Sequence, residues 1–567
     1  MKTQPRIQLR AVRARFTFHV SHFTSALAIV GLALACCPIN ASPPDDLDAL
    51  VERTRREFDL PGISVAIVKD GQAVVVKGYG VRQAGEAAPV DAETLFNIGS
   101  NTKAFTAATL ATLVEEGRLN WDDPVNQHLP GFQMYDPWVT REITVRDLLS
   151  HHSGLGLGAG DLLFYPETNF SREEIVARLR FLKPATSFRS RFAYDNGLFI
   201  VAGQLAQAIT GKTWEAAVQE RLLAPLGMQR TSFGPEAIAR VENKAIPHVQ
   251  LGQELKPAAY GNFANFAPAG GINSCAQDMA RWVTSLLADA KIRTTAAGGK
   301  PLLSPASRRE LWSAQTVIAA EDETFGPVLG QRHFAAYGLG FTLSDYQGHK
   351  LVWHGGGLPG QFSWVMLVPD LGLGIVLLSN TESYHGTLAL TYHLLDRYLG
   401  IPATDWITAV HKTAEQERAQ AAKTEARLAT QRNLKTKPSL PLPGYAGRYL
   451  DPWYGAVTLA SASGGLVLRF SRTPRLVADL EHWQHDTFVA RWRDRTLNAD
   501  AFVYFALNPD GTIAGMKLKP VSPLTDFSFD FHDLDFKLGF PRKNGHRIYV
   551  IHYLVCLIFE VKRALII

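Results

Sequence analysis

The chain has 567 residues, 46% of them hydrophobic, and this length is expected to form two domains with a large core. Its formal net charge of +5 arises at the ends, because residues 1–41 and 537–567 each carry a net +5 and leave the body near −5. A nucleic-acid partner would require a clustered basic face, and nothing in the body suggests one.

The first 41 residues have the pattern of a secretory signal peptide. A basic segment is followed by thirteen apolar residues from Ser25 to Cys37, and small residues surround Ala41. An apolar stretch of that length is short for a membrane span. We therefore expect a secreted, periplasmic protein. An uncleaved leader, or a lipid attached at Cys36, would instead associate the chain with a membrane.

Two β-rich runs, Ile63–Val68 and Ala73–Lys77, follow the leader and are joined across Asp70-Gly71, which is a hairpin signal. Four comparable runs occur much later in the chain, at residues 338–343, 350–353, 362–368 and 374–378. Between them the chain is mostly helical with long loops. We therefore expect an α/β (α+β) fold, with one antiparallel sheet built from both ends of the domain. Helices flank this sheet, and a helical region packs against it with a ligand cleft between the layers.

Ser100 and Lys103 are three residues apart, and the residues that follow, out to Val114, form one predicted helix that is too apolar to face water. Both side chains then leave the same face at the helix start. A serine hydroxyl is a poor nucleophile until a neighbouring base takes its proton. A lysine in apolar surroundings loses solvation, its pKa falls, and it can become that base.

Two further motifs follow in chain order. Tyr194-Asp195-Asn196 is a Tyr-x-Asn, and His354-Gly355-Gly356 is a His-Gly-Gly. Together with the Ser-x-x-Lys pattern, they make the chain resemble the serine β-lactamase and D,D-peptidase superfamily, and within it the class C-like branch. The resemblance covers roughly residues 45–400, and it implies that superfamily's arrangement of an antiparallel sheet with flanking helices and a helical region.

The resemblance implies a role for each motif residue. Ser100 is the expected nucleophile, and Lys103 would hold or shuttle its proton. Tyr194 would carry a proton to the leaving group, and a nearby ammonium could lower the pKa of its phenol so that phenolate acts as a base. Asn196 would hydrogen-bond Lys103 or the substrate carbonyl.

His354 stands where many relatives carry a lysine that pairs with a substrate carboxylate. Histidine is only partly charged near neutral pH, so we expect a weaker carboxylate clamp that strengthens below about pH 6.5. Gly355, Gly356 and Gly357 let a substrate approach the backbone without hindrance from a Cβ. By analogy with the family, the N–H groups of Gly357 and Ser100 would form the oxyanion hole.

Other signals of chemistry are weak. His151-His152 could suggest a metal pair, but no acidic partner at ligand spacing accompanies it, so we predict no metal site. The chain has no G-x-S-x-G motif, no Walker loop and no dinucleotide fingerprint. We therefore expect that no cofactor is needed.

Beyond the predicted catalytic domain, the composition changes twice. From His411 to Lys437 the chain is rich in Ala, Glu, Lys, Arg and Gln, which indicates a charged helix or linker, and short alternating runs after Tyr445 predict a small antiparallel β-sandwich or barrel. No residue of that β-domain suggests chemistry. The predicted segments are a signal peptide (1–41), a catalytic domain (42–405), a charged helical linker (406–440), an accessory β-domain (441–536) and an atypical basic and apolar tail (537–567).

The tail is open to two interpretations. It could dock on the β-domain, or it could be sequence that is not native to the protein, arising from read-through or a change of frame after Phe536. We favour the second, because the tail is basic and apolar with no clear period.

These observations predict a secreted serine hydrolase that works by acyl transfer on an ester, a D-amino-acid peptide or amide, or a β-lactam. A peptide or an ester ranks above an antibiotic. Two alternatives stay open. One is a binding or sensing protein of the cell envelope that is acylated but turns over slowly, with the β-domain contacting cell-wall material. The other is a β-lactamase proper. In each case the partner is a small-molecule or short-peptide acyl donor.

Overall fold

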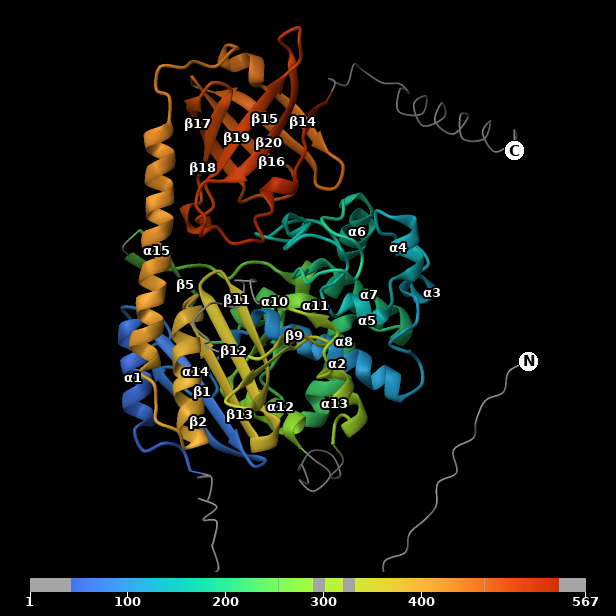
Figure 1. The fold of residues 1–567 in the computed structure, drawn as a ribbon, viewed down its shortest axis with the longest axis vertical. Coiled ribbons are helices and arrows are strands. Elements are labelled where there is room, and N and C mark those ends of the chain that lie inside the picture. The colour runs from blue at the N-terminus through green and yellow to red at the C-terminus, as the bar shows by residue number, and fades with distance from the viewer. Residues whose placement is uncertain (1–41, 253, 289–300, 320–331, 463, 540–567) are drawn as a thin grey trace, which may run out of the picture. The chain divides into compact units, whose positions relative to one another are not determined.

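The computed structural model describes residues 42–539, apart from 253, 289–300, 320–331 and 463. The predicted leader and residues 540–567 of the predicted tail lie outside the described residues. The described chain forms an eight-stranded sheet with helices on both faces, then a long helix, then an all-β domain (Figure 1).

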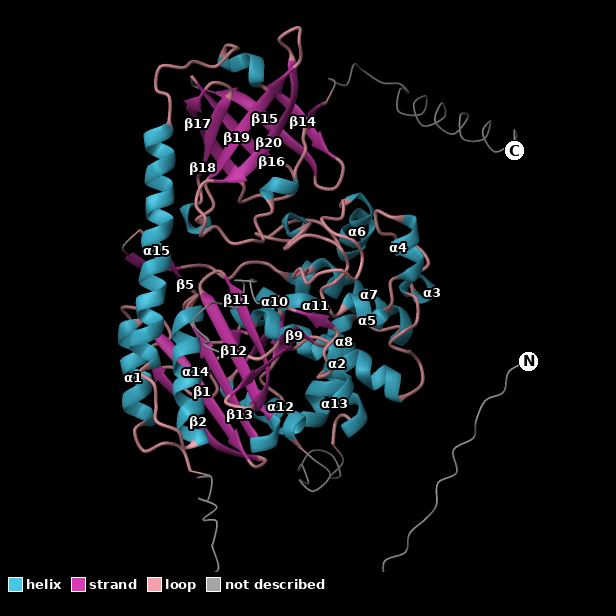
Figure 2. Cartoon of the chain, in the orientation of Figure 1, coloured by secondary structure: helices cyan, strands magenta, loops and turns pink. Residues whose placement is uncertain are grey.

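The first sheet combines strands from distant parts of the chain. Its order is β2-β1-β13-β12-β11-β10-β9-β8, and every neighbouring pair is antiparallel. The predicted antiparallel sheet with flanking helices is confirmed (Figure 2). Its strands are β1 (Gly62–Lys69), β2 (Gln72–Gly80), β8 (Thr316–Val317), β9 (Ala335–Tyr337), β10 (Thr342–Tyr346), β11 (His349–Leu358), β12 (Gln361–Val368) and β13 (Leu373–Ser379).

Helices cover both faces of this sheet, because side chains of its central strands alternate between two buried clusters. One cluster, with Ile63, Val65 and Ile67 of β1, includes α1 (Leu47–Glu57) and α14 (Tyr384–Leu399). The other, with Ala66 and Val68, includes α2 (Thr102–Glu115) and α12 (Ala276–Leu287). This two-sided burial explains why β1 and β13 read as continuous apolar runs.

The predicted helix after Ser100 is α2, and 11 of its 14 residues are buried. It lies among the other helices of the helical region, and its buried hydroxyls are satisfied: Thr106 donates to the Pro268 carbonyl at 2.6 Å and accepts from the Trp214 indole at 3.0 Å. The remaining helices of this region are α3 (Val125–His128), α4 (Pro137–Glu142), α5 (Val145–Leu148), α6 (Arg172–Arg178), α7 (Gly197–Thr210), α8 (Trp214–Val218), α9 (Ala224–Leu226), α10 (Gly234–Ala239), α11 (Ala267–Gly270) and α13 (Pro305–Leu311).

The hairpin predicted across Asp70-Gly71 is present, and both residues have positive φ, 51° and 81°, as a type I′ turn requires. One predicted strand starts later than expected: of the run at 338–343, residues 338–341 form a turn, and β10 begins at Thr342. The reason is Gly340, whose φ is +78° and whose added Cβ would lie 2.9 Å from a backbone oxygen of α2. The turn therefore packs closely on the start of that helix.

The charged segment after the first domain forms α15 (Trp406–Gln431), a helix of 26 residues. Its buried side chains are concentrated in its first half, where it packs against α14 and α1. Among the residues that the structure describes, no helix has both the length and the apolar character needed to cross a bilayer.

The C-terminal β-domain is a barrel. Consecutive strands pair in order from β14 to β20, and a backbone pair between Met516 and Phe536 (2.9 and 3.1 Å) joins β20 to the chain just before β21, which pairs with β14. The pairing therefore extends to Leu538. The strands are β14 (Gly447–Asp451), β15 (Gly455–Ala462), β16 (Gly465–Phe470), β17 (Val477–Gln484), β18 (Thr487–Trp492), β19 (Ala501–Leu507), β20 (Ile513–Pro520) and β21 (Lys537–Leu538).

Candidate active site

Ser100 and Lys103 lie together at the start of α2. Ser100 belongs to a single 3-10 turn, Gly99–Asn101, and Lys103 is the second residue of the helix that follows. The Lys103 Nζ lies 3.0 Å from the Ser100 Oγ. The two side chains therefore share one face, as their spacing predicts.

Strand β11 packs directly against this turn, and Gly356 makes the close approach possible. A Cβ added to Gly356 would lie 2.0 Å from the Ile98 carbonyl oxygen and 2.8 Å from the Ser100 nitrogen. The glycine is therefore required where the strand meets the Ser100 backbone.

Lys103 is completely buried, and its amine has three partners. The Nζ donates to Asn196 Oδ1 at 2.6 Å, to Ser100 Oγ at 3.0 Å and to the Ala269 carbonyl at 3.1 Å. None of these partners is charged. Burial lowers the pKa of Lys103 to about 7, although the carboxyls of Asp161 and Asp195 act in the opposite direction. Near neutral pH the amine can therefore accept a proton.

Tyr194 is positioned as the motif predicts, but its phenol titrates in the direction opposite to the expected one. Its side chain interacts with Ser100, and the Lys103 Nζ lies 4.8 Å from the centre of its ring. Burial raises the pKa of Tyr194 far above its ordinary value, and the interaction with Ser100 offsets only part of this. The phenol is therefore a neutral proton donor, and Lys103 is the better base of the pair.

The expected charge on His354 is also corrected. Its Nδ1 donates to the Gly355 carbonyl at 2.6 Å, so its Nε2 can accept from the Tyr337 hydroxyl, 2.8 Å away. Burial, reinforced by the charge of Lys103, lowers the pKa of His354 to about 3. The ring is therefore neutral at pH 6.5, and the predicted cationic clamp for a carboxylate is not supported.

A cavity of about 240 Å³ brings most of the predicted residues together. Ser100, Tyr194, Asn196, His354, Gly355 and Gly357 line it. Lys103 contacts Ser100 from beneath, and Gly356 faces the turn before α2. The other lining residues are mostly aromatic and acidic: Phe164, Tyr165, Phe266, Thr342, Trp353, Leu358, Phe362, Trp364, Glu382, Tyr384, Asp526, Phe527 and Ser528.

Two of the lining side chains are acidic. Burial raises the pKa of Glu382 to about 8, and the neighbouring Asp526 contributes further. Burial raises the pKa of Asp526 as well. Among the described residues that line the cavity, none is a lysine or an arginine. The cavity wall is therefore largely apolar, and its two carboxyls disfavour a negative charge on a bound molecule.

Several residues of the site have no signal in the sequence. The β-domain, to which the sequence assigned no chemistry, contributes Asp526, Phe527 and Ser528 to the cavity wall. Asp161 and Tyr337 contact Asn196 and His354, and neither belongs to a recognisable motif. Each contacts a motif residue from a different segment of the chain, and such a contact leaves no local pattern in the sequence.

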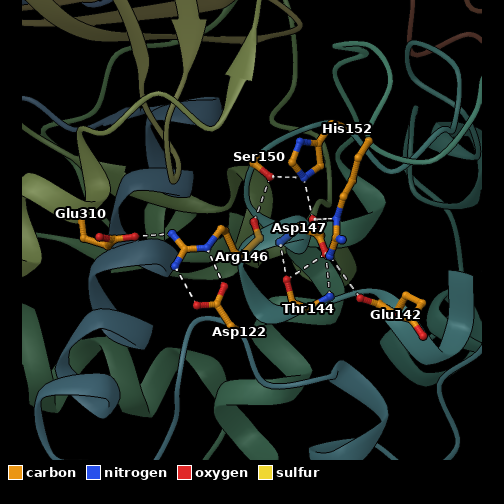
Figure 3. Close-up of polar contacts among 9 residues, drawn as sticks. Asp122, Glu142, Thr144, Arg146, Asp147, Ser150, His152 and Glu310 are labelled. Carbon is orange, nitrogen blue, oxygen red and sulfur yellow. Dashed lines mark hydrogen bonds and ion pairs between the residues drawn. The ribbon is translucent and has the colours of Figure 1, made fainter. Parts of the chain in front are cut away.

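An ion-pair network holds the loop that follows α5 (Figure 3). The buried carboxylate of Asp147 binds His152 Nε2 at 2.6 Å, Arg189 at 2.7 and 2.9 Å and the Thr144 N–H at 2.7 Å. Although burial opposes ionisation, these contacts hold the pKa of Asp147 well below its usual value. Asp147 is therefore a fixed negative charge beneath the loop.

This network also positions Tyr194. The loop residue His151 accepts hydrogen bonds on both sides of Tyr194, from the N–H of Ala193 to its carbonyl (2.9 Å) and from the N–H of Asp195 to its Nδ1 (3.0 Å). The His151 and Tyr194 rings lie 4.3 Å apart. The His151-His152 pair thus has a structural role here, and the described residues contain no group of three His, Cys, Asp or Glu placed to hold a metal.

Comparison with known proteins identifies the class. The family model described as beta-lactamase matches residues 47–398, and a domain of unknown function, DUF3471, matches residues 431–538. The chain is a serine hydrolase, and it belongs to the beta-lactamase family.

The relatives in this family include hydrolases from fungi. The chain is 33% identical over 435 residues to unguisins hydrolase ungD' of Aspergillus campestris, covering 73% of this chain and 77% of that protein. It is 28% identical over 511 residues to unguisins hydrolase ungD of Aspergillus violaceofuscus, covering 84% and 88%. Protein flp of Staphylococcus aureus is 26% identical over 353 residues, covering 59% and 63%.

Solved structures share the fold. An octameric penicillin-binding protein homologue from Pyrococcus abyssi matches 87% of this chain and 99% of its own, with a TM-score of 0.55 and 22% identity. The structure of SurE matches the same shares with a TM-score of 0.51 and 20% identity.

The Asp147 network yields a prediction for stability. The substitution Asp147→Ala removes a buried carboxylate that binds both His152 and Arg189, so we expect a loss of about 2 kcal/mol or more in unfolding free energy at pH 7. Because the folded-state pKa is depressed, the difference from wild type should shrink as pH falls below about 4. Urea denaturation across this pH range measures it.

The matched control is Asp122→Ala, which removes an exposed partner of Arg146 in the same view (Figure 3). That change should cost less than about 1 kcal/mol. Equal losses for the two variants would contradict a special role for Asp147.

Gly356 yields a prediction for reactivity. In Gly356→Ala the new Cβ must displace the Ser100 turn, so we expect acylation of Ser100 by an activated ester to slow by roughly 100-fold. The control is Gly131→Ala, since nothing lies within 4 Å of a Cβ there. Stopped-flow measurement of the acylation rate in both variants tests this prediction. A normal rate in Gly356→Ala would show that the strand does not position the serine.

Proposed function

We propose that the protein hydrolyses an amide or ester bond through a covalent acyl intermediate on Ser100. The observation that carries the proposal is the buried amine of Lys103, with its pKa lowered to about 7, at 3.0 Å from the serine hydroxyl. Lys103 takes the proton as the Ser100 oxygen attacks the carbonyl carbon. The leaving group departs, and water then releases the acyl group from the serine.

Tyr194 completes the movement of protons in this proposal. Its neutral phenol, which interacts with Ser100, gives its proton to the departing nitrogen or oxygen, and the protonated Lys103 restores it. The N–H groups of Ser100 and Gly357 are the proposed oxyanion donors. One such donor contributes about 3 kcal/mol in comparable sites.

The acid limb of the pH profile tests the base. Lys103 must be deprotonated to act, so kcat/KM should rise as pH increases and level off above about 7. The measurement uses a short-chain activated ester, with Ser100→Ala as the blank and Lys103→Met as the variant that lacks the base. An acid limb near pH 4 would indicate a carboxylate base and would reject this mechanism.

We further propose that the preferred acyl donor carries no free carboxylate next to the scissile bond. No cation lines the described cavity, His354 is neutral, and the Glu382–Asp526 pair resists further negative charge. A D-amino-acid amide, a D-amino-acid peptide with no free carboxylate beside the scissile bond, or an ester meets this condition. Peptides ending in D-Ala-D-Ala and β-lactams carry a carboxylate, which ranks them lower.

A matched pair of substrates tests the preference. A D-amino-acid peptide with a carboxamide end should be hydrolysed at least about tenfold faster than the same peptide with a carboxylate end, which corresponds to about 1.4 kcal/mol. The ratio should grow as pH rises through about 8, because Glu382 then ionises. It should narrow in Glu382→Gln, and faster hydrolysis of the carboxylate form would contradict the proposal.

The relatives named for unguisins make those compounds a natural addition to the substrate panel. A chromogenic cephalosporin belongs in it too, because rapid hydrolysis that Ser100→Ala abolishes would favour the β-lactamase alternative. A stable adduct on Ser100 with negligible turnover would favour the binding or sensing alternative.

We also propose that the protein is exported, on the pattern of residues 1–41 alone. Fractionation of producing cells, with sequencing of the mature N-terminus, tests this. An intact leader on a protein that stays inside the cell would reject it.

A further inference from the structure

The amide of Asn196 lies between Lys103 and the buried carboxyl of Asp161. Its Oδ1 accepts from the Lys103 Nζ at 2.6 Å, and its Nδ2 donates to Asp161 Oδ2 at 2.8 Å. An amide has one acceptor end and one donor end, so the partner at the donor end decides which end faces the lysine. Asp161 therefore orients the amide that Lys103 contacts.

Asp161 is completely buried at the start of a 3-10 turn, Asp161–Leu163, and its Oδ1 has no hydrogen-bond partner among the described residues. Burial raises the pKa of Asp161 well above its usual value. Its carboxyl is thus held in an apolar setting by few contacts, and its position depends on the loop that carries it.

The loop from Gly158 to Asp161 is held by the barrel. The Gly160 N–H donates to Asp530 Oδ2 at 2.5 Å, and the Ser528 side chain interacts with the Asp161 carboxyl. Phe527 packs so closely on Gly158 that an added Cβ there would lie 2.8 Å from its ring. Residues 526–530 therefore cover this loop.

The same barrel segment also packs on Tyr194, next to the Ser100–Lys103 pair. The ring of Phe527 packs edge-to-face on Tyr194 at 6.0 Å, and the Gly158 N–H donates to the Tyr194 carbonyl at 2.9 Å. One segment of the second domain thus contacts Tyr194 directly and Asn196 through Asp161.

We propose that Asp161 is a positioning residue for Lys103, acting through Asn196, and that residues 526–530 of the barrel hold it in place. The inference rests on the proposed function only in taking Ser100 and Lys103 as the reactive pair. The inference assigns the barrel a part in positioning the reactive pair. The barrel holds Asp161, and Asp161 orients the Asn196 amide whose oxygen contacts the Lys103 amine beside the serine.

The direction of the effect follows from the contacts. Without an acceptor at position 161, the Asn196 amide is free to turn and present its NH₂ to Lys103. The ammonium then loses an acceptor, so its deprotonation shifts to lower pH. The amine also loses the contact that places it, and misplacement of a reacting group slows reaction by roughly 10- to 100-fold.

The test uses the full-length protein and a fluorophosphonate probe, which forms an Oγ–P bond at Ser100 with loss of fluoride. This readout needs no knowledge of the acyl donor. The rate of labelling is measured from pH 5 to 9, with mass spectrometry to locate the adduct and thermal denaturation to confirm folding. The variants are Asp161→Leu, which removes the acceptor, and Asp161→Asn, which keeps an acceptor oxygen.

We expect Asp161→Leu to label roughly 10- to 100-fold more slowly at its plateau, with an acid limb displaced to lower pH. Asp161→Asn should restore the rate and the limb towards wild type. From the barrel side, Asp530→Ala should show the same displacement to a smaller extent. Asp510→Ala is the matched control, because this acid caps an exposed barrel turn outside the covering segment and, among the described residues, bonds only within that turn.

A uniform fall in rate with no displacement of the limb would show a merely structural role and overturn the inference. So would equal defects in Asp161→Asn and Asp161→Leu, or normal behaviour of Asp530→Ala. If Asp161→Leu fails to fold, the comparison of Asp530→Ala with Asp510→Ala decides alone. Failure of the wild type to label at Ser100 would overturn the proposed function, and the inference with it.

Discussion

The removal of water from the Lys103 amine is the physical constraint on which the site depends. An ammonium group taken into a protein interior loses several kcal/mol of hydration, which is recovered only by pairing or by release of a proton. Helix α2 is buried along most of its length, and the segments around it offer the Nζ a hydroxyl, an amide oxygen and a backbone carbonyl. Since none of these is charged, the group lies close to the border between its two protonation states at neutral pH.

The same loss of solvation determines the state of the neighbouring groups. The phenol of Tyr194 keeps its proton and the imidazole of His354 stays uncharged, because each would have to carry a charge away from water. Glu382 resists ionisation for the same reason. Asp147, which keeps a fixed negative charge, lies outside the cavity beneath a loop, where it orders the polypeptide around Tyr194. The charge of Asp147 thus supports the scaffold, while the phenol, the imidazole and Glu382 stay uncharged beside the reacting atoms.

Short-range patterns made much of this structure predictable. Apolar runs and a turn signal at Asp70-Gly71 act over a few residues, and they predicted the sheet built from both ends of the domain. The helical spacing of Ser100 and Lys103 predicted their contact. The directions of the pKa shifts at Tyr194 and His354 were not predictable, because they depend on how completely distant segments exclude water. For the same reason, no motif indicates Asp161, or that Asp526 of a separate domain lines the cavity.

The contribution of the barrel to the cavity wall has a consequence for how such enzymes diversify. The nucleophile and its base lie on one helix, while part of the surface that a bound molecule touches belongs to a domain joined through the 26 residues of α15. Recombination that exchanges one barrel for another would alter which compounds fit without any change at the reactive pair. New selectivity could then arise in a module whose own sequence carries no trace of chemistry.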